Sequence, residues 1–100
     1  MGIFRDLYFS SESYKIALDI NKLYTDVYRM LLSERCMNRN AVSIVREIKQ
    51  KLNILSTKAK ECTYLVAFIK VPMPNGHEVP VMQYVNSMNI ELDKLLCNYQ

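Results

Sequence analysis

Apolar and polar residues alternate along this chain with a helical period. In three stretches the apolar positions recur at steps of three and four, over residues 16–30, 45–69 and 81–99. That spacing places the apolar residues on one face of an α-helix, and its heptad form is typical of helices that pack side by side at shallow angles. The pattern therefore predicts three long helices.

Residues that favour helix ends set the predicted boundaries. Ser10 or Ser11 suits the position before the first helix, and Asn38 or Asn40 suits the position before the second. Pro80 is tolerated in the first turn of a helix because its missing N–H would have no partner there. We therefore predict helices at about 11–36, 40–70 and 79–98, after an apolar N-terminal segment at 1–10.

The stretch between the second and third helices has two interpretations. Residues 63–71, TYLVAFIKV, are rich in β-branched and aromatic side chains and also suit a strand, with 77–82 as its partner across an Asn75-Gly76 turn. We favour a helix because the heptad pattern continues and Pro80 is unfavourable within a strand. The predicted fold is one all-α domain over residues 1–100, an antiparallel three-helix bundle with a long helical hairpin. The alternative is an α+β fold with a β-hairpin at about 63–82.

Charged residues support an antiparallel pairing of the first two helices. When their apolar positions are aligned, Asp26 lies opposite Lys51 and Asp19 lies opposite Lys58. Such pairs favour one register and orientation. The other edge of the first helix carries Ala17, Tyr24 and Leu31, so we expect the third helix to pack there.

Several large apolar residues point away from this predicted core. On the first helix they are Tyr14, Leu18, Tyr28 and Leu32; on the second they are Ile54, Tyr64, Phe68 and Val71. Exposed apolar surface of this extent marks interaction sites. We predict a homo-oligomer, with a dimer favoured and Tyr28, Leu32, Ile54, Tyr64 and Phe68 as its interface; the competing interpretation is a monomer that the N-terminal segment wraps more completely.

Composition narrows the class of protein. Half of the residues are hydrophobic, which excludes a disordered chain, and the net charge of +3 is modest for a nucleic-acid-binding domain. The three cysteines have no CxxC spacing, so we expect reduced thiols, a cytoplasmic location and no metal site. No signal peptide and no membrane-spanning run is expected. Abundant Lys, Asn, Ile and Tyr suggest an AT-rich source such as a virus, phage or mobile element.

The sequence offers little catalytic chemistry. His77 is the only histidine and lies in the predicted turn without a neighbouring nucleophile or carboxylate array, and the two glycines form no phosphate-binding loop. We therefore expect no enzyme activity and no cofactor.

Arginines are more informative, because four of them flank the predicted turn between the first two helices: Arg29, Arg35, Arg39 and Arg46. Their planar guanidinium groups suit carboxylates and phosphates; a solvated helix end is the simpler explanation. Our leading hypothesis is a small non-enzymatic protein-interaction module, an accessory regulator or inhibitor. The alternative is binding of nucleic acid or a phosphorylated ligand through the arginines.

Overall fold

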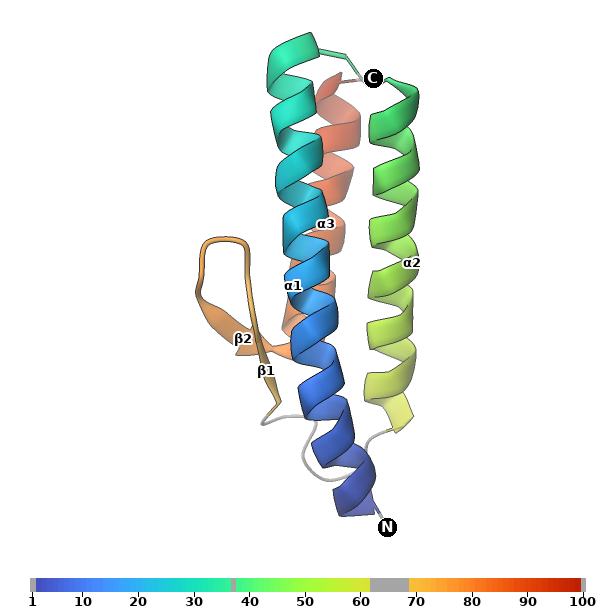
Figure 1. Cartoon of the computed structure of the whole chain (residues 1–100), viewed down its shortest axis with the longest axis vertical. Coiled ribbons are helices and arrows are strands. Elements are labelled where there is room, and N and C mark those ends of the chain that lie inside the picture. The colour runs from blue at the N-terminus through green and yellow to red at the C-terminus, as the bar shows by residue number, and fades with distance from the viewer. Residues whose placement is uncertain (1, 37, 62–68, 100) are drawn as a thin grey trace.

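The computed structural model describes residues 2–36, 38–61 and 69–99, which form three helices and one short β-hairpin (Figure 1). The elements are α1 (Gly2–Glu34), α2 (Arg39–Glu61), β1 (Lys70–Pro72), β2 (Glu78–Pro80) and α3 (Val81–Tyr99). The molecule is elongated, 48 × 22 × 18 Å. Helix α2 runs antiparallel to α1, and α3 ends near the α1–α2 turn (Figure 1). The predicted antiparallel three-helix bundle is confirmed.

The core follows the predicted seam on α2 but is wider on α1. The buried residues of α2 recur at steps of three and four: Ala41, Val45, Ile48, Leu52, Leu55 and Ala59. On α1, Ile20 and Val27 are fully buried, and so are Ala17 and Leu31 on the edge predicted to face the third helix. Helix α1 therefore buries one side against α2 and an adjoining side against β1 and α3.

Helix α1 begins at Gly2, so the prediction of a separate segment at 1–10 and a helix from residue 11 is wrong. Its buried face continues through Ser13 to Phe9, which is 3% exposed. The Ser13 hydroxyl donates a hydrogen bond to the Ser10 carbonyl at 3.0 Å inside the helix. Ser10 and Ser11 lie inside this helix, so the prediction that one of them caps its start is also wrong.

The turn between α1 and α2 is fixed by residues on both sides. Arg35 follows α1 with φ of 57°, and its N–H donates to the Leu31 carbonyl at 2.8 Å, as in a left-handed helix end. Asn38 precedes α2, and its Oδ1 accepts from the Ala41 N–H at 2.8 Å. This confirms the predicted cap at Asn38, which also explains why α2 starts at Arg39.

The predicted ion pairs between α1 and α2 are wrong. Lys58 Nζ lies 2.5 Å from Glu12 Oε1, and among the described residues no carboxylate of Asp19 or Asp26 lies within 4 Å of a lysine. Glu12, Asp19 and Asp26 repeat every seven positions along this edge, and Lys58 pairs with the first of them rather than with Asp19. The hydrogen bond to Glu12 raises the pKa of the Lys58 ammonium.

The segment before α3 is a short antiparallel hairpin in which Val71 pairs with Val79. The predicted helix to residue 70 is thus wrong at 69–70, residues 62–68 lie outside the described part, and the hairpin weighed as the alternative is present at 70–80. Pro72 and Pro80 end the two strands because proline donates no ladder hydrogen bond. Pro80 therefore lies in β2, and α3 starts one residue later.

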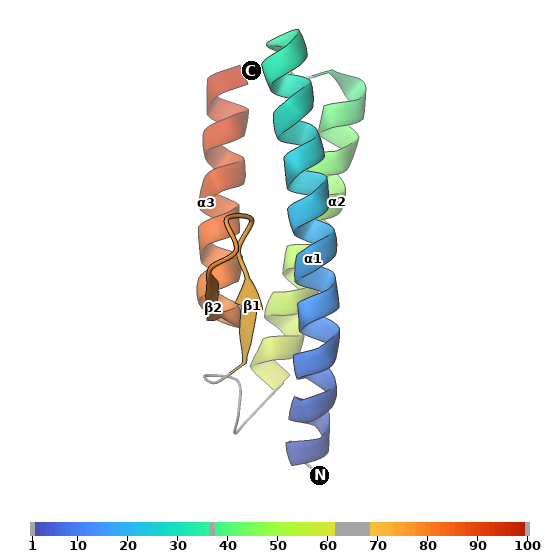
Figure 2. The same cartoon turned by 60° about the vertical axis from the view of Figure 1, so that its left-hand side comes forward.

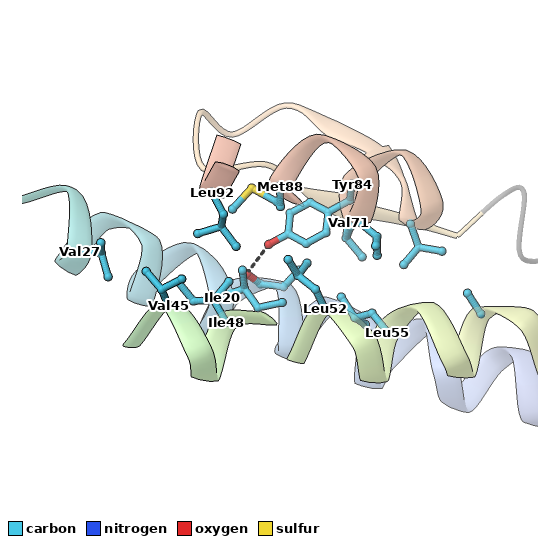
Figure 3. Packing of buried hydrophobic residues seen from close by; sticks show 14 of the residues in the cluster. Ile20, Val27, Val45, Ile48, Leu52, Leu55, Val71, Tyr84, Met88 and Leu92 are labelled. Atoms are coloured by element: carbon cyan, nitrogen blue, oxygen red, sulfur yellow. Dashed lines mark hydrogen bonds between the residues drawn. The ribbon is translucent and has the colours of Figure 1, made fainter. Parts of the chain in front are cut away.

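Strand β1 lies between α1 and α3 (Figure 2). The Asn21 side chain on α1 donates from Nδ2 to the Pro72 carbonyl at 2.8 Å and accepts at Oδ1 from the Tyr84 hydroxyl at 2.7 Å. The Tyr84 ring lies between α3 and α1 near Val71 and Met88 (Figure 3), and the Ala17 carbonyl is 3.2 Å from its hydroxyl. Burial raises the pKa of Tyr84. One polar network therefore holds α1, β1 and α3 together.

Candidate functional site

Helix α1 carries a second apolar face that the described residues cover only in part. Tyr14, Leu18, Tyr28 and Leu32 are 44%, 47%, 44% and 55% exposed. At about 100° per residue these four positions fall within one quarter of the helix circumference. We call them the α1 strip.

The α1 strip consists of two copies of one local pattern. Residues 14–18, YKIAL, and residues 28–32, YRMLL, both read tyrosine, basic residue, two apolar residues, leucine. The copies are 14 residues apart, or about 21 Å along a helix that rises 1.5 Å per residue. The strip therefore presents the same group of side chains twice, at two levels of one rigid element.

Two of the polar residues between the two copies, Asn21 and Thr25, make their hydrogen bonds inside the protein, whereas Lys22 is exposed. Thr25 Oγ1 donates to the Asn21 carbonyl at 2.9 Å. The Asn21 amide is occupied by Pro72 and Tyr84. Covering this part of the helix would leave neither polar side chain without a partner, so the usual penalty for burying polar groups is small here.

A shallow pocket adjoins the C-terminal half of the α1 strip, where Tyr28 lies. The tip of the β-hairpin meets α1 and α3 around a space of about 200 Å³ lined by Tyr24, Met73, Pro74, Asn75, Met88 and Glu91. Tyr24 stacks on Tyr28 of the strip, with ring centroids 6.3 Å apart. Burial, with the Glu91 carboxylate nearby, raises the pKa of Tyr24. The stacked rings make the strip and this pocket one continuous surface.

Basic side chains border the strip, whereas Glu12, Asp19 and Asp26 of α1 lie on the side that faces α2. Lys15 and Arg29, one in each copy of the pattern, are exposed and have no carboxylate within 4 Å among the described residues. Glu12 is bound to Lys58 of α2. Asp19 and Asp26 line a groove of about 310 Å³ with Lys51 and Glu47 of α2.

The fold gathers the four predicted arginines at the end of the bundle that holds the α1–α2 turn. Arg29 lies near the end of α1, Arg35 follows it, and Arg39 and Arg46 lie in the first turns of α2. All four are exposed, and none has a carboxylate within 4 Å in the described part of the chain. Helices α1 and α3 both end here (Figure 1), and cations near helix C-termini are favourable. This effect gives a structural reason for Arg35 and a weaker one for Arg29, whereas Arg39 and Arg46 lie in the first part of α2, where the helix dipole does not favour a cation.

The residues predicted as an oligomer interface fall on two helices. Tyr28 and Leu32 belong to the α1 strip, Ile54 is 45% exposed on α2, and Tyr64 and Phe68 lie outside the described residues. Val71, expected to point outward, is fully buried because it is the central residue of β1. The repeated pattern in α1 was the sequence signal that could have joined Tyr14 and Leu18 to Tyr28 and Leu32 as one surface.

The remaining polar chemistry is dispersed. His77 is exposed in the hairpin loop, where its N–H donates to Asn75 Oδ1 at 3.0 Å. Cys36 and Cys97 are exposed free thiols. Over the ranges that the structure describes, no group of three His, Cys, Asp or Glu side chains is placed to hold a metal ion, and no helix is long and apolar enough to cross a bilayer.

A second groove, between α2 and α3, is lined mainly by amides. Its walls include Asn53, Asn86 and Asn89, and Lys49 at its rim lies 3.9 Å from Asp93 of α3. The volume is about 310 Å³. Because this groove joins no charged cluster and no exposed apolar surface, it adds nothing specific to the site.

Comparison of the chain with protein-family models, with curated proteins and with solved structures found no match. The function is therefore argued from the residues alone.

Proposed function

We propose that this protein is a non-catalytic interaction module that binds another protein through the α1 strip. The observation that carries the proposal is the strip itself: four large apolar side chains, each about half exposed, on one face of one helix. They form two apolar pairs, Tyr14 with Leu18 and Tyr28 with Leu32, and exposed apolar groups on one face of a folded chain mark a site of interaction.

Two further features suit such a site. Tyrosine is enriched at the centres of protein interfaces because it combines a large ring with a hydroxyl, and the strip has two tyrosines. Of the polar residues between them, Asn21 and Thr25 are already hydrogen-bonded within the protein. A partner can therefore bury apolar area without leaving these two side chains unpaired.

Composition and the exposed thiols support a more specific proposal about the kind of protein, its source and its location. A short chain that binds another protein and is rich in Lys, Asn, Ile and Tyr fits an accessory regulator or inhibitor of a virus, phage or mobile element. Two exposed free thiols, Cys36 and Cys97, suit a reducing cytoplasm. Self-association is the competing use of the same strip.

Affinity capture from the native host tests the proposal with two matched double variants. Leu18→Ser/Leu32→Ser removes two apolar side chains from α1, and Val42→Ser/Ile54→Ser removes two of similar exposure from α2. We expect a partner that the wild type and the α2 variant both retain and that the α1 variant loses. Loss of the partner from the α2 variant alone, or from both variants equally, would contradict a site on α1.

A second candidate function rests on the arginines. Arg35, Arg39 and Arg46 are exposed and have no carboxylate within 4 Å among the described residues, so their guanidinium groups are available to phosphate. Retention on DNA or RNA at low salt, falling steeply as salt rises, would support nucleic-acid binding. No retention at low salt would exclude it.

A further inference from the structure

The α1 strip has the geometry of one side of a helix–helix seam. Its two copies repeat after 14 residues, which is two heptads. From Tyr14 to Leu32 the strip extends about 27 Å, the length of about 18 residues of a partner helix. A partner helix that has its own heptad pattern and coils slightly around α1 places apolar residues against both copies of the pattern, as in helix recognition by an apolar groove.

The border of the strip is positive on its solvent side. Lys15 and Arg29 stand beside Tyr14 and Tyr28, and no described carboxylate lies within 4 Å of either cation. Among the nearby acids of α1, Glu12 pairs with Lys58 of α2, and Asp19 and Asp26 lie on the side that faces α2, where they line a groove with Lys51. A partner with carboxylates at these two levels would meet unpaired cations, and complementary charge favours both encounter and register.

The same charges disfavour a second copy of the chain. If two strips packed antiparallel about a two-fold axis, the pattern at 14–18 of one copy would meet the pattern at 28–32 of the other. The symmetry would then place Lys15 beside Arg29 of the second copy and Lys22 beside Lys22 of the second copy. Like charges in facing positions are destabilising.

We propose that the α1 strip receives an amphipathic helix from a different protein, with acidic residues along the border of its apolar stripe. This inference rests on the proposed function and adds the chemistry of the partner. Each copy of the pattern supplies one tyrosine and one leucine to the apolar seam and one cation to its edge. Among the described residues the Tyr14 and Tyr28 hydroxyls make no hydrogen bond, so both are free to donate to the partner's carboxylates.

Two synthetic helical peptides test the inference. Both carry the same heptad stripe of leucine, and they differ only in bordering residues, glutamate in one and lysine in the other. Binding to the full chain is measured by fluorescence anisotropy at low and high salt. The protein variants are Leu18→Ser/Leu32→Ser, Lys15→Glu/Arg29→Glu and, as a control of equal charge change on α2, Lys49→Glu/Lys60→Glu. Circular dichroism and thermal unfolding check that each variant is folded.

We expect the wild type to bind the acidic peptide roughly ten-fold more tightly than the basic one at low salt, with a smaller preference at high salt. Leu18→Ser/Leu32→Ser should lose the acidic peptide, Lys15→Glu/Arg29→Glu should reverse the preference, and the α2 control should change neither.

Equal affinity for the two peptides, or no saturable binding of either, would overturn the acidic-helix inference. A dimeric mass for the wild type that Leu18→Ser/Leu32→Ser converts to a monomer would overturn it in favour of a second copy. None of these results decides the proposed function, which stands or falls with capture of a partner from the host.

Discussion

Helix α1 has two apolar faces, and adjacent residues show how they differ. Leu31 is fully buried on the side that meets β1 and α3, whereas Leu32 is 55% exposed on the α1 strip. The same contrast separates Ala17 from Leu18, which is 47% exposed. Both faces are apolar, but the described residues fully cover only the first. The fold therefore accounts for the first face and not for the second.

The largest effect should come from shortening the two neighbouring leucines in turn. Leu31→Ala leaves a cavity in the core and should lower the free energy of unfolding by about 2–5 kcal/mol. Leu32→Ala removes a half-exposed side chain and should change it by less than about 0.5 kcal/mol. Urea unfolding of the two variants measures both values. Similar losses would mean that the two faces are not distinct.

A smaller effect should follow from removal of the Tyr84 hydroxyl, which ties the covered face of α1 to α3. Tyr84→Phe leaves Asn21 Oδ1 without its donor and should cost about 1–2 kcal/mol. Urea unfolding at neutral pH measures this loss. An unchanged free energy of unfolding would mean that the network does not stabilise the covered face.

The same hydroxyl should make stability depend on alkaline pH. Burial raises the pKa of Tyr84 above its ordinary value of 10.0, so the unfolded chain releases this proton at lower pH than the folded one. The stabilisation that the Tyr84 hydroxyl provides is therefore complete below pH 10.0 and declines as the pH rises above it. Unfolding measured across this range should show a steeper decline for the wild type than for Tyr84→Phe. Equal slopes would contradict the role of burial.

A smaller effect should distinguish the observed ion pair between α1 and α2 from the predicted one. It is the energetic coupling between substitutions of the two paired side chains. Glu12→Lys should destabilise, and Lys58→Glu should restore part of the loss, because these side chains form an ion pair. Asp19→Lys combined with Lys58→Glu serves as the comparison and should show no such rescue. Rescue at Asp19 and not at Glu12 would favour the register that the sequence predicted.

The smallest expected change concerns the uncovered face. Leu18→Ser/Leu32→Ser should leave the free energy of unfolding within about 0.5 kcal/mol of the wild type, because neither side chain fills a core site. Thermal unfolding followed by circular dichroism measures this. A large loss would mean that the α1 strip serves the fold, and the proposed binding role would lose its main support.

Period and capping chemistry in the sequence were enough to predict the bundle. The steps of three and four located the buried residues of α2, and Asn38 was correctly placed before that helix. The start of α1 was not predicted, because the same serines that cap helices also bond within them, as Ser13 does to Ser10. The charged register was not predicted either, because a seven-residue repeat offers Lys58 two acids.

The β-hairpin and the candidate site show a different limit of prediction from local sequence patterns. Short strands such as Lys70–Pro72 and Glu78–Pro80 depend on packing between α1 and α3, through contacts like that of Asn21 with the Pro72 carbonyl, which no local pattern contains. The outward residues of α1 were visible in the sequence. The hydrogen bonds that Asn21 and Thr25 make within the protein lower the free-energy cost of covering these two side chains. These bonds could be identified only in the structure.

Photo-crosslinking from the uncovered face tests the central claim most directly. A photoreactive phenylalanine analogue is placed at Leu32 in one variant and at Gln50, on the exposed polar side of α2, in another, and each is irradiated in the native host. We predict a covalent adduct with a different protein from position 32 and none from position 50. No adduct from position 32, or equal adducts from both positions, would contradict the claim that the α1 strip is the binding face.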